Sequence, residues 1–515
     1  MRSGLTLCVA AVAAAAGTSA HAAWYQASSK HFVIYANENP NELSDFATKL
    51  ERFDQAVRYV RGMDDPPVGL GNRLTVFVLP SVDAVQRLMN GDRFIEGFYT
   101  GRASGSYAFV PRTTGADGPN MLNAGTIFFH EYSHHLMFQI VDRPLPQWVV
   151  EGFAEFMSTV RFEKNGDIGL GAPANHRAWG LLLGAKLPLE TMLGGNLSKL
   201  TPELRESLYG RGWLLVHYLT FEKSRSGQLD RYVDLMSKGA PSLEAARTAF
   251  GDLKQLDRDL DSYLRRSMLS YLRLAGARFQ SGKIEVQPLS EGAAKVIMLR
   301  AQSKRGVNQK TAEPLAQQVR EVEAHYPGDE LVELTLSEAE LDAGHAEASQ
   351  AAADRALNAN PNDTKAMVFK GRATLARALT MSGEQRRTMC DEARRLFIAA
   401  NKLDTEDPEP LMDFYQSFLA EGLRPNENAV AALHYASDLA PQDTGLRMNS
   451  ALQYLRDGEA AEAKRALTVI AYDPHGEQLA QVARTIIEMI EAGNLKDALA
   501  AARPGGGSAT ASSPN

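Results

Sequence analysis

Five consecutive residues, His130-Glu131-Tyr132-Ser133-His134, have the types and the spacing of a site that binds a metal and moves a proton. On a helix, side chains four residues apart lie one above the other on the same face, so both imidazoles can bind one ion. Glu131 projects beside them into the same space. With 11 histidines in 515 residues, chance alone gives this pattern in roughly one or two such chains per hundred, so the neighbouring residues must decide its meaning.

The residues around this motif predict a buried helix. Phe128 and Phe129 precede the motif, and Leu136 and Met137 follow it. A titratable side chain in such an apolar stretch is costly unless it is paired or bound to a metal. We therefore expect a core helix whose two imidazoles are directed at an ion.

A second apolar stretch, Trp148 to Phe156, contains two acids four residues apart. Glu151 and Glu155 therefore share one face of a predicted helix. The alternative is a pair of unrelated helices whose acids face solvent. It is disfavoured because both carboxyl groups lie within an otherwise apolar and aromatic sequence.

Together the two stretches resemble a known group of enzymes. His130-Glu131-x-x-His134 followed by Pro-x-Trp-x-x-Glu151-Gly-x-Ala-Glu155 is similar to the pattern of the gluzincin metallopeptidases, in particular the peptidase-MA-like family of exported proteins. The resemblance covers residues 24–219 and includes the helix that contains Tyr209. It implies a zincin-like α+β domain that hydrolyses peptide bonds.

The resemblance also implies a role for each of six residues. These are His130, His134 and Glu151 as the ligands of one Zn²⁺ per chain, Glu131 as the general base, Glu155 as the hydrogen-bond partner of a ligand histidine, and Tyr209 as the stabiliser of an oxyanion.

Physical chemistry supports these roles. Two imidazoles and one carboxylate leave a fourth position for water, which is the arrangement of a catalytic rather than a structural zinc site, and this ligand set favours zinc over other divalent ions. Zinc lowers the pKa of bound water towards about 7, and Glu131 can take that proton and pass it to the leaving amine. The phenol of Tyr209 can donate to the developing oxyanion.

Four other side chains near these positions have weaker claims to a role. His135 points about 100° away from its ligand neighbour, which favours packing or support of a ligand. His217 fits a core histidine better than a site residue. His176 and Arg177 follow a Gly-Ala-Pro loop, where a substrate contact and a plain surface role are both open.

The elements that must position these residues follow from hydrophobic periodicity and turn signals. The predicted strands span 31–35, 74–79 and 105–110, and the predicted helices span 41–60, 124–140, 146–156 and 202–222. Asn123 and Thr201 are expected to cap two of the helices. The strand at 105–110 is expected to line the cleft and to pair with an extended substrate.

The C-terminal part has a different pattern, in which prolines recur at intervals of 34, 47, 33 and 33 residues. They are Pro327, Pro361, Pro408, Pro441 and Pro474. A period near 34 predicts paired-helix repeats, and small residues at matching offsets resemble tetratricopeptide (TPR) repeats. An unrelated helical bundle is the alternative. The longer interval implies an insertion near residues 380–388.

These patterns divide the chain into five segments. They are a secretory signal peptide at 1–22 cleaved near Ala22, a gluzincin-like peptidase domain at 23–270, a linker or helical connector at 271–311, TPR-like repeats at 312–503, and a disordered tail at 504–515. Deletion from about residue 312 onward is expected to leave the metal site intact. Loss of Cys8 with the signal would leave only Cys390, which excludes a disulfide within the mature chain.

Charge and composition narrow the function classes. The net charge is −7 with no basic block, so neither nucleic acid nor an anionic membrane is an expected partner, and no transmembrane segment is expected in the mature chain. The leading hypothesis is a periplasmic or secreted zinc metallopeptidase that acts on a peptide or protein substrate, with the repeats recruiting a substrate or protein partner. The alternative is a catalytically silent zinc-binding scaffold whose repeats mediate protein–protein interaction.

Overall fold

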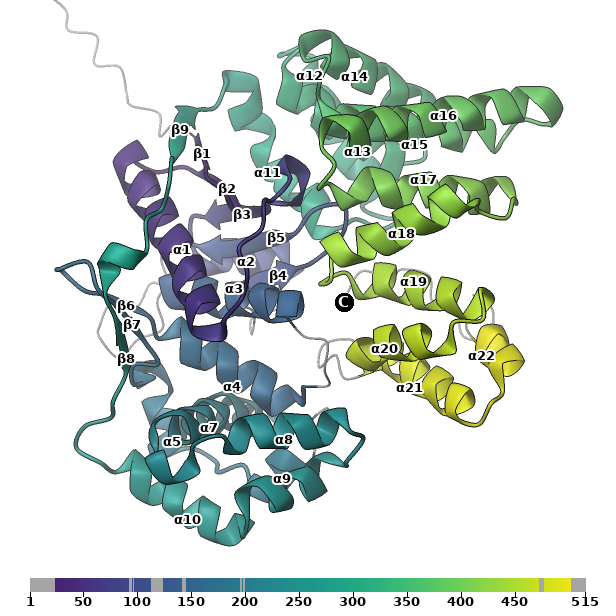
Figure 1. The fold of residues 1–515 in the computed structure, drawn as a ribbon. Coiled ribbons are helices and arrows are strands. Elements are labelled where there is room, and N and C mark those ends of the chain that lie inside the picture. Colours follow the sequence, from purple (N-terminus) through teal and green to yellow (C-terminus); the bar gives the residue numbers. More distant parts are fainter. Residues whose placement is uncertain are drawn as a thin grey trace, which may run out of the picture.

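The computed structural model describes residues 24–91, 95, 97–112, 124–140, 145–194, 197, 200–471 and 477–501. The expected signal peptide, the expected cap Asn123 and the expected disordered tail lie outside the described residues. Among the helices of the described part, none is long and apolar enough to cross a membrane. The molecule comprises an N-terminal unit built around a sheet and a C-terminal array of helices that runs along one side of it (Figure 1).

Six strands form the main sheet, in the spatial order β4-β5-β3-β2-β1-β9. Their bounds are β1 Tyr25–Ser28, β2 Phe32–Ala36, β3 Leu74–Leu79, β4 Phe98–Thr100, β5 Tyr107–Pro111 and β9 Glu285–Pro288. Strands β2, β3 and β5 are parallel, and β1, β9 and β4 are each antiparallel to a neighbour. The three strands predicted from the sequence correspond to β2, β3 and β5.

The expectation that strand 105–110 pairs with a substrate backbone is wrong. One side of β5 pairs with β3 and the other with β4. Its main-chain groups are therefore already used inside the sheet. The edge strand on this side is β4, a short segment that the sequence pattern did not reveal.

Helices cover both faces of this sheet. Alternate strand residues point to opposite sides, and apolar side chains on both sides pack against helices. Phe32 and Ile34 pack in the same core as α1 (Pro40–Arg61) and α3 (Ala124–Ile140). On the other face, Phe77 and Phe109 pack against α2 (Val82–Leu88) and α11 (Glu291–Arg305). Helix α3, which bears the histidine motif, therefore lies directly on the sheet.

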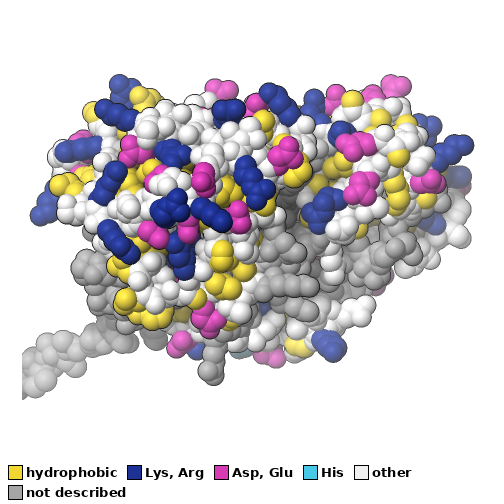
Figure 2. Space-filling model, turned by 90° about the horizontal axis from the view of Figure 1, so that it is seen from below, with side chains coloured by type: hydrophobic (Ala, Val, Ile, Leu, Met, Phe, Trp, Pro, Cys, Tyr) yellow, Lys and Arg dark blue, Asp and Glu magenta, His cyan; other side chains and the backbone are white. Residues whose placement is uncertain are grey.

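A helical lobe follows α3 in the chain and shares its core. Its helices are α4 Gln147–Ser158, α5 Ala178–Leu182, α6 Leu189–Leu193, α7 Pro202–Phe221, α8 Gln228–Ser237, α9 Ser242–Phe250 and α10 Leu253–Leu264. The Thr201 hydroxyl accepts from the Leu204 amide and caps α7 as expected. A small second sheet, ordered β6-β7-β8, closes the lobe, with β6 at Arg161–Phe162, β7 at Ile168–Leu170 and β8 at Leu272–Leu274. Seen from below (Figure 2), the described surface has Lys and Arg side chains intermixed with Asp and Glu.

The segment 271–311, expected as a linker or helical connector, is built into the N-terminal unit. It supplies β8 to the second sheet, β9 to the edge of the main sheet, and α11 to one face of that sheet. Ile297 and Ala301 of α11 are fully buried against sheet residues. Short strands with few apolar residues leave little periodic signal, and their pairing with distant strands is visible only in three dimensions.

The prediction of paired helical repeats is confirmed by a run of helices in which each packs on the next. They are α12 Ala312–Glu323, α13 Glu330–Asp342, α14 Ala346–Ala359, α15 Thr364–Ala378, α16 Gly383–Leu403, α17 Pro408–Glu421, α18 Glu427–Leu439, α19 Thr444–Arg456, α20 Ala460–Ala471, α21 Glu477–Glu491 and α22 Leu495–Ala501. Small residues permit this close packing, and Ala356, Ala436 and Ala463 are fully buried. The interval of 47 residues contains α16, which has 21 residues against 14 in α14.

Candidate metal centre

Two neighbouring helices bring the three expected ligands together. His130 and His134 lie one turn apart on α3, and Glu151 lies on α4, which packs against α3. His134 and Glu151 are buried, whereas His130 is partly exposed. The apolar neighbours that marked both stretches in the sequence are the residues that fix both helices in the core.

The donor atoms of these residues have the separations that a tetrahedral ion needs. His130 Nε2 lies 3.1 Å from His134 Nε2 and 3.4 Å from Glu151 Oε2, and His134 Nε2 lies 3.7 Å from the same oxygen. Ligands at the usual zinc distances of about 2.0–2.1 Å in tetrahedral geometry are themselves about 3.4 Å apart. The donor set and its spacing therefore fit zinc.

Glu155 lies at the centre of a set of hydrogen bonds beside the ligands. Its Oε1 is 3.3 Å from His130 Nδ1, and its side chain also accepts from His176 Nε2 at 3.0 Å and from Arg177 Nε at 3.2 Å. Arg177 donates in turn to both oxygens of Glu206. Although burial raises the pKa of Glu155, the charge of Arg177 and the histidine hydrogen bonds outweigh it and hold that pKa well below its usual range.

Glu151 and Glu155 of α4 also raise the pKa of His130. Burial disfavours a charged His130, but hydrogen bonds to Glu151 and Glu155, with their charges, outweigh burial and raise its pKa to about 10 in the metal-free protein. A cation is therefore favoured at this position, whether it is a proton on the imidazole or a metal ion that replaces that proton.

Tyr209 of α7 lies beside the same group of residues. Its ring packs edge-on against the ring of His130, with 5.9 Å between centroids, and the Arg177 guanidinium lies 5.0 Å from its centroid. The charge of Glu151, together with burial and the charge of Glu131, raises the pKa of Tyr209 well above its usual value. Its phenol therefore remains a hydrogen-bond donor at neutral pH.

Two glycines allow α4 and α7 to approach closely enough for this arrangement. A methyl group on Gly152 would lie 2.5 Å from the carbonyl oxygen of Gly212 and 3.0 Å from its Cα. One on Gly212 would lie 3.1 Å from the Cα of Gly152. The two backbones are therefore in direct contact one residue after Glu151, which sets the position of that ligand relative to Tyr209.

We expect Gly152→Ala to destabilise the fold and to weaken metal binding. Alanine gains about 0.5–1 kcal/mol of helix preference over glycine, but forcing a methyl group against the backbone of α7 costs typically about 1–3 kcal/mol, so the clash outweighs the gain. The measurements are the free energy of unfolding and the zinc affinity. Gly180→Ala in α5 is the control, since its methyl group would meet its nearest neighbour at an ordinary 3.4 Å. Equal stabilities of the two variants would contradict the close approach.

The structure gives different roles to His217, His176 and Arg177, the weaker candidates for the site. His217 is fully buried and satisfied by the Tyr263 hydroxyl and the Ser270 carbonyl oxygen, each at 2.9 Å, as expected of a core histidine. His176 and Arg177, for which a substrate contact and a surface role were both open, instead hold Glu155. No sequence pattern indicated this contact, because their partner lies 21 and 22 residues earlier.

His135 faces away from the two candidate ligand histidines, as its position on the helix predicts. Its Nδ1 lies 2.8 Å from the hydroxyl of Tyr99 on β4, and its ring stacks on Tyr132. Burial, together with the nearby charges of Arg58 and His31, lowers the pKa of His135 to about 3. Tyr99 was not identified from the sequence, because β4 itself was not.

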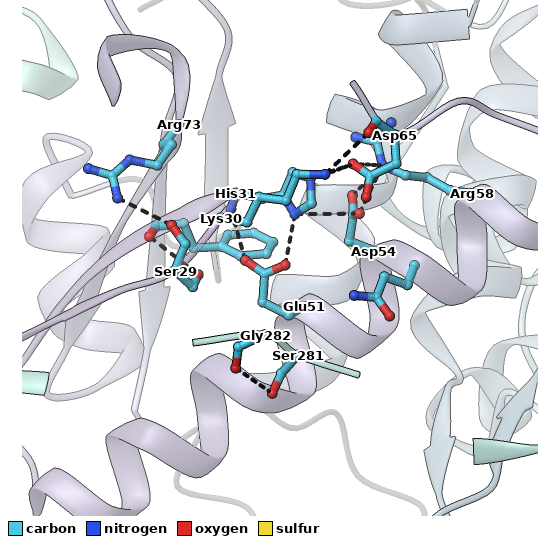
Figure 3. Close-up of polar contacts among 12 residues, drawn as sticks. Ser29, Lys30, His31, Glu51, Asp54, Arg58, Asp65, Arg73, Ser281 and Gly282 are labelled. Carbon is cyan, nitrogen blue, oxygen red and sulfur yellow. Dashed lines mark hydrogen bonds and ion pairs between the residues drawn. The ribbon is translucent and has the colours of Figure 1, made fainter. Parts of the chain in front are cut away.

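A second group of titratable residues surrounds His31 (Figure 3). His31 Nδ1 is 2.7 Å from Glu51 Oε2 and its Nε2 is 2.9 Å from Asp65 Oδ1, while the Arg58 guanidinium donates to Asp54. The Tyr132 hydroxyl of α3 also donates to Asp54 at 2.7 Å.

This group is better explained as a structural ion network than as a second metal site. His31, Asp54 and Asp65 could each offer a ligand atom. However, Lys30 and Arg58 supply positive charges beside Asp65 and Asp54. Burial lowers the pKa of His31, but its carboxylate partners outweigh burial and raise that pKa above its usual value. The carboxylates are therefore already paired with cations, and the network anchors α3 to α1.

Comparisons with known proteins concern the helical array. No family model and no curated protein matches the chain. Among solved structures, the TPR protein TTC0263 of Thermus thermophilus is similar, with 15% identity, a TM-score of 0.31, and coverage of 37% of this chain and 93% of that one. MamA of Desulfovibrio magneticus (residues 41 to the end) is similar at 15% identity and a TM-score of 0.26, over 40% of this chain and 98% of that one. Scores this low carry no argument, and the assignment of paired helices rests on the contacts between successive helices.

Proposed function

We propose that this chain is a zinc-dependent hydrolase of peptide bonds, with an N-terminal unit related to the gluzincin metallopeptidases. The observation that carries the proposal is the set of three donor atoms, from His130, His134 and Glu151, at separations of 3.1 to 3.7 Å. Glu131 follows the first ligand directly. A structural zinc site needs no general base and normally closes its fourth position with a protein ligand.

The proposed division of labour follows from the chemistry of the side chains. Zinc held by the three ligands would supply a Lewis acid that acidifies water and polarises a carbonyl group. Glu131 would accept a proton from the attacking water and return it to the leaving amine. Tyr209, protonated at neutral pH, would donate to the developing oxyanion. Glu155 would accept from the Nδ1–H of His130 and so hold the tautomer in which Nε2 is free to bind the ion.

The direct test is the zinc content of the purified chain and of Glu151→Ala. We expect about one zinc per unmutated chain and a loss of at least about tenfold in affinity for the variant, since even an outer partner of a ligand contributes 10–100-fold. The surface variant Glu203→Ala, on the first turn of α7, is the control and should keep its zinc. Absence of zinc from the unmutated chain, even after reconstitution, would overturn the proposal.

Export forms part of the same proposal. The N-terminal sequence supports cleavage near Ala22 and a location in the periplasm or outside the cell. The intact mass of the protein recovered from its natural compartment tests this, and a mass that includes residues 1–22 would contradict it.

A second candidate is a catalytically silent zinc-binding scaffold whose helical array binds another protein. The observation that favours it is the size of the array, which extends from residue 312 to residue 501, because stacked helix pairs provide extended binding surfaces. Zinc content does not distinguish the two candidates, but activity does. A chain that holds zinc and cleaves no member of a broad peptide library would favour the scaffold.

A further inference from the structure

The helical array makes a specific contact with the N-terminal unit near α3, the helix that bears His130 and His134. Residues 101–106, between β4 and β5, pack against α17, α18 and α19, which Figure 1 shows beside β4 and β5. The 3₁₀ turn at Leu70–Asn72 lies against α17 and the end of α18. We call residues 101–106 the docking loop. Ala103 in this loop is almost fully buried in an apolar cluster that also includes Tyr415 and Leu433 of the array.

Polar contacts give this packing a defined register. The Asp443 carboxylate accepts the Ala103 amide at 2.8 Å, and Gln442 Nε2 donates to the Ser106 hydroxyl at 3.1 Å. Gln442 and Ser106 are both buried. A methyl group on Gly101 would come within 2.6 Å of the Gln442 side chain, so the loop backbone itself lies against the array.

The docking loop is linked through two further side chains to the helix that bears the ligands. The Ser106 hydroxyl lies 3.4 Å from the hydroxyl of Tyr99, and the Tyr99 hydroxyl lies 2.8 Å from His135 Nδ1. His135 follows the ligand His134 directly on α3. A continuous series of side chains therefore connects Gln442 of the array with α3.

A second turn of the array shows that this contact is not a general property of the repeat. Pro441-Gln442-Asp443-Thr444 matches Pro361-Asn362-Asp363-Thr364, and both aspartates cap the helix that follows. However, Asn362 is exposed, whereas Gln442 is buried against the docking loop. Asp443 uses one oxygen for the cap and the other for Ala103, whereas the Asp363 side chain accepts from amides of its own turn.

We propose that Gln442 and Asp443 are positioning residues for the candidate metal centre, and that part of the array thus serves this chain's own N-terminal unit rather than an external partner. The docking loop, held by these residues, keeps Tyr99 against His135 and so fixes α3. Any effect of Gln442 and Asp443 on catalysis rests on the proposed function, whereas their effect on the position of α3 does not. It also replaces the expectation that a chain truncated from about residue 312 keeps an intact site.

The test compares Gln442→Ala/Asp443→Ser with the matched control Asn362→Ala/Asp363→Ser. Serine keeps a cap oxygen in both variants, so only the first loses contacts to the docking loop. Hydrogen–deuterium exchange of the metal-free proteins is followed for residues 98–107 and 124–140. We expect exchange in both segments to rise by about tenfold in the first variant, as for loss of one or two buried hydrogen bonds, and to stay unchanged in the control. Equal exchange in the two variants would overturn the proposal.

Tyr99→Phe separates positioning from general stability. It removes the hydroxyl between Ser106 and His135 but leaves every contact between the array and the docking loop. Exchange should therefore rise in residues 124–140 and not in residues 101–106, and a chelator should remove zinc several-fold faster. An unchanged zinc release rate and unchanged exchange in 124–140 would overturn the link to α3. If the unmutated chain binds no zinc, the proposed function fails, whereas the exchange measurements still decide the positioning role.

Discussion

Glu131→Gln should lower the rate constant of peptide hydrolysis by about 10²–10⁴-fold, the usual contribution of a general base, and leave the zinc content unchanged. That factor corresponds to about 3–5 kcal/mol of activation free energy. Glutamine has nearly the same shape and keeps a hydrogen-bond acceptor, but its amide cannot accept a proton from water at neutral pH. The measurement is kcat on the best substrate found in a peptide library, together with zinc per chain.

The control for this substitution is Glu203→Gln, which removes the same charge from the exposed first turn of α7. It should keep both zinc and activity. Retained activity in Glu131→Gln would show that another group moves the proton. Loss of zinc from Glu131→Gln would instead show that Glu131 helps to hold the metal.

Arg177→Leu should destabilise the protein by about 3–5 kcal/mol, as expected when one partner of a buried ion pair is removed. Glu155 is 1% exposed and Arg177 only 16% exposed, so the carboxylate would lose its main compensating charge without gaining water. Without Arg177, Glu155 would favour a protonated His130 more strongly, which opposes metal binding. The measurements are the free energy of unfolding by denaturant and the zinc affinity at neutral pH.

Arg247→Leu provides the comparison, because Arg247 and its partner Glu190 are both more than half exposed. Such pairs contribute about 0–1 kcal/mol. If the two substitutions cost the same free energy, Glu155 does not depend on Arg177. If only stability changes and the zinc affinity does not, the arginine supports the fold but not the candidate ligands.

The sequence by itself determined much of what lies near the candidate site. Helices α3, α4 and α7 and strands β2, β3 and β5 are all marked by apolar stretches in the sequence, and local caps such as Thr201 mark where helices begin. The resemblance to the gluzincin metallopeptidases implied the three candidate ligands, and α3 and α4 bring their donor atoms together. The pairing of His130 with His134 depends on residues four positions apart, whose relative geometry is set by the helix itself.

Tertiary structure decided everything that depends on residues distant in the chain. The ion pair between Arg177 and Glu155 and the backbone contact between Gly152 and Gly212 arise only when separate elements pack together. The same is true of β8 and β9, which are too short to show a period, and of the docking loop, whose partner Gln442 lies 336 residues after Ser106. Periodicity records which face of an element is buried, but not what it is buried against, because any apolar or complementary surface satisfies the same pattern.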